Sequence, residues 1–136
     1  MKKVTQDQLV LVFAIMLFIG ILLYVYNQGR RKGTTIADIG DDYVRPGFNP
    51  SVLVQDGHDI LTKFATGANA RDEYFRRLNE LSDGELKTVY NAYNDRYFKK
   101  DKKTFVQVIK DAWFTVVFGT SPKTLVLERF ERMQLA

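Results

Sequence analysis

One uninterrupted apolar run constrains this chain more than any other feature. Residues 9–26 read LVLVFAIMLFIGILLYVY, eighteen positions without a charged side chain. As a helix they would extend about 27 Å, close to the roughly 30 Å hydrocarbon thickness of a bilayer. A cleaved signal peptide is the alternative, but a run of this length without a small-residue cleavage site favours an anchor. The pattern predicts an N-terminal transmembrane helix.

The flanks of this run fit the same interpretation. Two tyrosines end it, where interfacial aromatic rings belong, and a basic cluster follows that would meet lipid headgroups. Basic residues flank both ends, so the orientation is nearly a tie, with a slight lean towards a cytoplasmic C-terminal domain. The spanning and interfacial positions are predicted to be Leu9, Phe13, Phe18, Leu22, Tyr24, Tyr26, Arg30, Arg31 and Lys32.

The distribution of charge narrows the function classes. The chain has 136 residues and a net charge of +4, and the first 33 residues carry all of that excess. Residues 34–136 hold 15 basic and 15 acidic side chains, which argues against a nucleic-acid partner. The absence of cysteine and the single histidine exclude thiol catalysis, cysteine zinc sites and two-histidine metal sites. We expect no enzyme activity, no cofactor or metal and no small-molecule substrate.

The remainder of the chain predicts a small helical domain behind a connector. Residues 33–50 combine glycine, proline and acidic residues and predict a segment without regular structure. We therefore divide the chain into an anchor (1–29), a basic juxtamembrane segment and linker (30–50) and a helical domain (51–136). Apolar residues at helical spacing predict helices over 59–66, 71–81, 86–97, 105–113 and 122–133.

Several residues define the ends and inner faces of these helices. Ser82 and Glu85 form a capping-box pattern, and Ser121 followed by Pro122 predicts another helix start. Tyrosines at 90, 93 and 97 continue an apolar stripe that we interpret as core. Five short helices with short loops predict an all-α bundle. Residues 113–118, WFTVVF, fit a short strand, a helix end or an exposed patch.

Gly67-Ala68-Asn69 follows the predicted helix over 59–66, and the acidic pair Asp72-Glu73 comes after it. With these features, residues 59–114 resemble one annexin-type repeat in a divergent, bacterial or phage-like form, in which they would be the glycine-rich loop after the first helix and the acidic pair that follows it. The resemblance implies a five-helix shape. Annexin repeats that bind calcium have a second glycine where Asn69 stands and a distal carboxylate where Ala112 stands. The resemblance therefore implies the shape without the calcium site.

Three groups of residues are candidate sites. His58 lies among acidic residues and fits either a base oriented by a carboxylate or, preferably, a polar residue at a helix start. The apolar residues of 113–118 are the preferred partner patch. The basic turn, residues 99–103, fits either a solvated loop or a binding site for the phosphates of nucleic acid or lipid. The partner-binding candidates are Trp113, Phe114, Phe118, Lys99, Lys100, Lys102 and Lys103.

These features together predict a non-enzymatic, single-pass membrane protein. Its helical domain would link a lipid bilayer to a protein shell or larger complex, as an adaptor. A minor capsid protein at the internal membrane of a virion fits this role, as does a small subunit of a complex in a bacterial cytoplasmic membrane. The alternative is a lipid- or envelope-binding module that acts through the basic turn.

Overall fold

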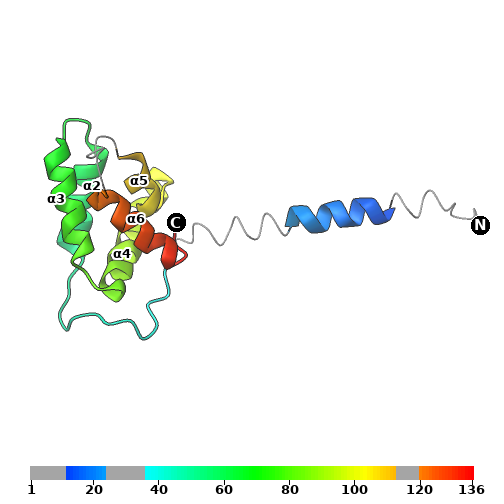
Figure 1. Cartoon of the computed structure of the whole chain (residues 1–136), viewed down its shortest axis with the longest axis horizontal. Coiled ribbons are helices and arrows are strands. Elements are labelled where there is room, and N and C mark those ends of the chain that lie inside the picture. The colour runs from blue at the N-terminus through cyan, green and yellow to red at the C-terminus, as the bar shows by residue number, and fades with distance from the viewer. Residues whose placement is uncertain (1–11, 24–35, 113–119) are drawn as a thin grey trace, which may run out of the picture. The chain divides into compact units, whose positions relative to one another are not determined.

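A computed structural model of the chain describes residues 12–23, 36–112 and 120–136. The chain divides into two units, Met1–Lys32 and Gly33–Ala136, and each is considered by itself (Figure 1). In the first unit, residues 12–23 form a helix with exposed side chains. The second, here called the folded unit, contains the helices α2 to α6.

The expected transmembrane helix is wrong, and so is the expected single-pass membrane localisation. Over residues 12–23, 36–112 and 120–136, no helix has both the length and the apolar character that crossing a membrane requires.

The folded unit is built from five helices, and no strand occurs in the part of the chain that the structure describes. Its all-α architecture agrees with the helical spacing of the sequence. Helix α3 packs on α6, α2 packs on α3, α4 and α5, and α5 contacts both α4 and α6 (Figure 1). The helices are α2 (Ser51–Thr62), α3 (Ala68–Asn79), α4 (Asp83–Asp101), α5 (Phe105–Asp111) and α6 (Pro122–Arg132).

Side-chain caps begin three of these helices. The capping box predicted for Ser82 and Glu85 is present at the start of α4. Ser121 caps α6 and Pro122 occupies its first turn, as predicted. Helix α5 starts with a second capping box, between Thr104 and Gln107, which the sequence analysis did not single out. Each box satisfies backbone N–H groups that the first helical turn leaves without a partner.

Aromatic rings fill the centre of the bundle. The tyrosine stripe of α4 is buried, which confirms its interpretation as core. Phe130 of α6 lies 5.7 Å from the Tyr90 ring and 6.1 Å from the Phe105 ring, between centroids. Tyr93 lies 4.6 Å from Phe105. Such tilted and edge-on pairs add about 0.5–1.5 kcal/mol each to the burial of the rings, so they join α4, α5 and α6.

Residues 36–49, here called the strap, have no helix or strand, yet they are fixed to α4. The Asn91 side chain accepts a hydrogen bond from the Ala37 N–H at 2.6 Å and donates one to the Ala37 carbonyl at 2.9 Å. A Cβ atom on Gly84 would lie 2.5 Å from the Tyr43 carbonyl oxygen, so only glycine allows this approach. The strap is therefore part of the folded unit rather than a free spacer.

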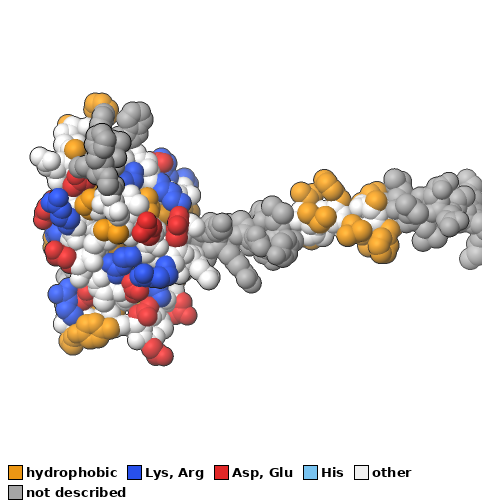
Figure 2. All heavy atoms as spheres, in the orientation of Figure 1, with side chains coloured by type: hydrophobic (Ala, Val, Ile, Leu, Met, Phe, Trp, Pro, Cys, Tyr) orange, Lys and Arg blue, Asp and Glu red, His pale blue; other side chains and the backbone are white. Residues whose placement is uncertain are grey.

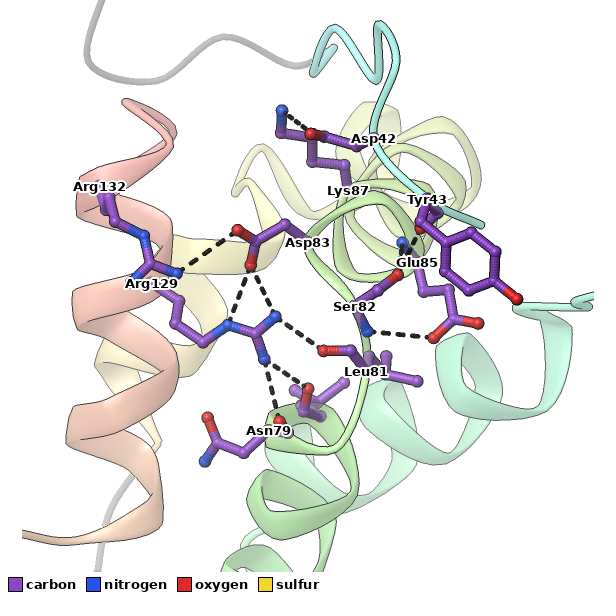
Figure 3. A network of polar contacts seen from close by, with 11 residues as sticks. Asp42, Tyr43, Asn79, Leu81, Ser82, Asp83, Glu85, Lys87, Arg129 and Arg132 are labelled. Atoms are coloured by element: carbon purple, nitrogen blue, oxygen red, sulfur yellow. Dashed lines mark hydrogen bonds and ion pairs between the residues drawn. The ribbon is translucent and has the colours of Figure 1, made fainter. Parts of the chain in front are cut away.

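Arg129 joins α6 to the turn between α3 and α4 (Figure 3). Its guanidinium donates hydrogen bonds to the carbonyls of Leu78, Asn79 and Leu81 at 2.8–3.2 Å. It also contacts the Asp83 carboxylate at 2.7 Å, and this contact lowers the pKa of Asp83. The half-buried Arg129 guanidinium thus satisfies backbone carbonyls at the end of α3 and balances the charge of Asp83 at the start of α4.

Replacing Arg129 with Met should lower the free energy of unfolding by about 2–4 kcal/mol, because three carbonyls and a carboxylate lose a charged donor. Arg132→Met is the control, since Arg132 is 67% exposed and reaches Asp83 only at 3.5 Å. Its cost should stay below about 1 kcal/mol. Urea unfolding followed by circular dichroism measures both. Equal losses would contradict the assigned role of Arg129.

The pair between Arg45 of the strap and Glu85 predicts a pH dependence. The hydrogen bond from Arg45 lowers the pKa of Glu85, and the Ser82 N–H acts in the same direction. A lowered pKa stabilises the fold above the ordinary glutamate pKa, and this contribution is lost as pH falls through the lowered value. Glu85→Gln should therefore be less stable than the unaltered chain at pH 7. Urea unfolding at about pH 3 should show a smaller difference; a difference that grows in acid contradicts the pair.

Candidate functional site

The structure describes only some of the predicted site residues. Phe13, Phe18 and Leu22 are exposed on the helix over residues 12–23. The predicted interfacial and patch residues outside the described part of the chain are Leu9, Tyr24, Tyr26, Arg30, Arg31, Lys32, Trp113, Phe114 and Phe118. The preferred partner patch at 113–118 therefore stays a prediction.

Part of the basic turn is helical rather than a loop. Lys99 and Lys100 lie in the last turn of α4 and are exposed. Lys102 ends the helix in the left-handed conformation, with φ 57°, and its N–H donates to the Phe98 carbonyl at 2.8 Å. Lys103 pairs with Asp111 of α5 at 2.6 Å. All four lysines of the turn are therefore exposed, and one of them, Lys103, is tied to α5.

His58 lies within α2 rather than at its start, because α2 begins at Ser51. Its imidazole is stacked on the Tyr97 ring, with centroids 3.8 Å apart and planes 5° apart. Nδ1 of His58 lies 3.3 Å from the Tyr93 hydroxyl. Burial raises the pKa of Tyr93, so this hydroxyl stays protonated and can donate to a neutral imidazole. The interpretation of His58 as a polar residue at a helix start is wrong, since two tyrosines of α4 hold its ring.

Asp101, the last residue of α4, faces the same imidazole. Its Oδ2 atom lies 3.6 Å from His58 Nδ1, which is longer than a hydrogen bond. This oxygen is buried and has no hydrogen-bond donor among the described residues. The carboxylate side chain as a whole is 25% exposed. An ionised carboxylate in this position is costly unless a charge or donor compensates it.

These groups line an open cleft of about 680 Å³ between α2, the end of α4 and α5. The Asn94 side chain accepts a hydrogen bond from the Phe105 N–H at 2.8 Å, which fixes the start of α5 beside α4. The cleft is thus framed by three helices, and a buried hydrogen bond holds the junction of α4 and α5. Its lining residues are His58, Leu61, Thr62, Asp101, Lys103, Val108 and Asp111.

The cleft can bind polar groups, but its residues do not form a complete catalytic arrangement. A carboxylate beside a histidine is the setting of a general base. Thr62 carries the one hydroxyl among the lining residues, and it donates to the His58 carbonyl within α2. The described residues contain no group of three or more side chains that could hold a metal. The described lining residues therefore offer an imidazole, two carboxylates and one ammonium group to a bound polar group.

An exposed phenylalanine, Phe64, follows α2 in the chain, and the last residues of α2 line the cleft. Helical spacing predicted a helix over 59–66 that includes Phe64, but α2 ends at Thr62 and Lys63 is extended. Phe64 is therefore outside the helix and 93% exposed, more than any other large apolar side chain in the described residues. Buried Arg71 donates to the Lys63 carbonyl at 3.2 Å, so the backbone before Phe64 is held from α3.

Sequence reasoning identified His58 but not its site, and it did not connect Phe64 with the cleft. The signal for Asp101 was present in the alternation of acid and base within the basic turn, where one carboxylate stands between two lysine pairs. No spacing rule placed that carboxylate against α2, because 43 positions separate Asp101 from His58. Only helix packing brings them together.

Comparison with known proteins adds no family to this description. No protein-family model matches the sequence, and neither a curated protein nor a solved structure matches it. The annexin-like resemblance is therefore neither supported nor refuted and stays a prediction. A function for this chain is therefore argued from the cleft and the residues around it.

Proposed function

We propose that the folded unit is a non-enzymatic docking module that binds a protein partner. Binding would use the cleft and the loop between α2 and α3, residues 63–67, here called the Phe64 loop. The observation that carries the proposal is the 93% exposure of Phe64, two residues after the helix whose end lines the cleft. Large aromatic side chains beside a pocket are typical anchors of protein interfaces. This keeps the predicted adaptor role and omits the transmembrane anchor.

The construction of the loop supports a role in binding. The Thr66 N–H donates to the Lys63 carbonyl at 3.2 Å, and Arg71 donates to the same oxygen. A loop that is fixed before binding loses less conformational entropy when it docks. Figure 2 shows basic and acidic side chains interspersed over the visible face of the folded unit. A partner that binds through a few side chains fits such a mixed surface better than a partner that recognises a broad surface of one charge.

Site-specific photo-crosslinking tests the docking role. A photoreactive phenylalanine analogue replaces Phe64 in the full chain, and the same analogue replaces Glu128, which is exposed on α6, as the control. In extract of the source cells, position 64 should give a discrete crosslinked protein that position 128 does not give. A Thr62→Arg change, which adds a large side chain to the lining of the cleft, should abolish that product. Identical products from both positions, or none from position 64, would overturn the proposal.

One observation favours a second candidate, binding to an anionic phospholipid surface through the basic turn. Lys99, Lys100 and Lys102 are exposed, and none of the three pairs with an acidic side chain in the described residues. Each basic residue near an anionic surface contributes about 1 kcal/mol. Binding of this kind needs no spanning helix.

Co-sedimentation with phosphatidylserine vesicles tests this candidate. Changing Lys99, Lys100 and Lys102 to Gln should abolish salt-sensitive binding. The control changes Lys63, Arg76 and Lys110 to Gln, which alters the net charge equally at exposed positions elsewhere. Equal losses in both triple variants, or no binding by the unaltered chain, would reject the basic turn as a lipid site.

A further inference from the structure

The cleft contains one carboxylate whose charge the described residues leave uncompensated. Asp111 and Lys103 form an ion pair at 2.6 Å, so their charges balance. Within the described residues, the one ion pair of Asp101 is with the His58 imidazole, at 3.6 Å, and a neutral imidazole brings no charge. With neutral His58, the lining of the cleft therefore carries a net charge of about −1.

The contact between His58 and Tyr93 bears on whether His58 can compensate the charge of Asp101. Tyr93 is fully buried, and its hydroxyl lies 3.3 Å from Nδ1 of His58. When that hydroxyl donates to Nδ1, the same nitrogen cannot donate to Asp101. The buried Oδ2 of Asp101 then has no donor. A cation brought into the cleft from outside would compensate the carboxylate without disturbing the bond to Tyr93.

We propose that the cleft binds a basic side chain of the docking partner, arginine in preference to lysine. This inference rests on the docking role proposed above and names the chemistry of the partner at the same site. The volume of about 680 Å³ exceeds what one hydrated ion requires and suits an extended group. Leu61 and Val108 supply apolar lining for the hydrocarbon stem of such a side chain.

The setting of the Asp101 carboxylate favours a guanidinium over an ammonium group or a metal ion. A guanidinium is planar, carries five N–H donors and is more weakly hydrated than an ammonium, so it loses less on entering a half-buried cleft. A metal ion fits less well, since no cluster of three or more candidate ligands is present among the described residues.

Titration of the full chain with small arginine derivatives tests this proposal, followed by amide chemical shifts. The probes are N-acetyl-arginine methylamide, its lysine counterpart and the neutral citrulline counterpart. The arginine probe should shift the amides of Leu61, Thr62 and Lys103, while the citrulline probe should leave them unchanged. The lysine probe should bind more weakly than the arginine probe. Equal shifts from arginine and citrulline, no shifts from arginine, or lysine binding as tightly as arginine would overturn the proposal.

Matched variants locate the binding on one carboxylate. Asp101→Asn should weaken arginine binding by about tenfold or more, whereas Asp95→Asn, at an exposed position of the same helix, should leave it unchanged. Thermal melting of both variants establishes that the fold is intact. Unaltered affinity in Asp101→Asn, or an equal loss in Asp95→Asn, would overturn the proposal.

The two proposals can fail separately. A specific crosslink from position 64 without any arginine binding leaves the docking role and removes the basic side chain as its ligand. No specific crosslink from position 64 removes the docking role itself, and with it the assignment of the cleft to a partner's side chain.

Discussion

The arrangement of the folded unit depends on one guanidinium. Arg129 reaches from α6 to the turn that ends α3 and begins α4, and it satisfies three carbonyls there. Helix α4 carries more of the buried aromatic side chains than any other described helix, and because it is continuous, the position of its first turn sets where its last turn lies. The last turn holds Asp101, one wall of the cleft. A contact at one end of α4 thus helps to fix the site at the other end.

The cleft itself follows from how α4 stops and α5 starts. Lys102 takes the left-handed conformation that ends a helix, a position where glycine is usual and another residue costs roughly 1 kcal/mol. The Asn94 side chain and the Thr104 capping box then hold the start of α5. This sharp turn leaves the carboxylate of Asp101 facing α2. The proposed binding role uses a charge that the fold positions but does not neutralise.

Local patterns predicted the bundle better than they predicted the site. Helical spacing, the Ser82 capping box and the buried tyrosine stripe are all present as predicted. Spacing failed at Phe64, because a periodic pattern does not show where a helix ends, and α2 ends two residues earlier. It also failed for residues 9–26, where an apolar run predicted a membrane span that the described residues do not contain.

The sequence by itself determined the all-α class, the starts of α4 and α6, and the rings that form the core. These properties depend on residues within a few positions of one another, where capping and side-chain periodicity act. Only the tertiary structure decided that the strap binds α4 and that His58 meets Asp101. It also decided which carboxylate is left uncompensated. Such contacts join residues tens of positions apart, and their geometry comes from helix packing, which local sequence patterns do not encode.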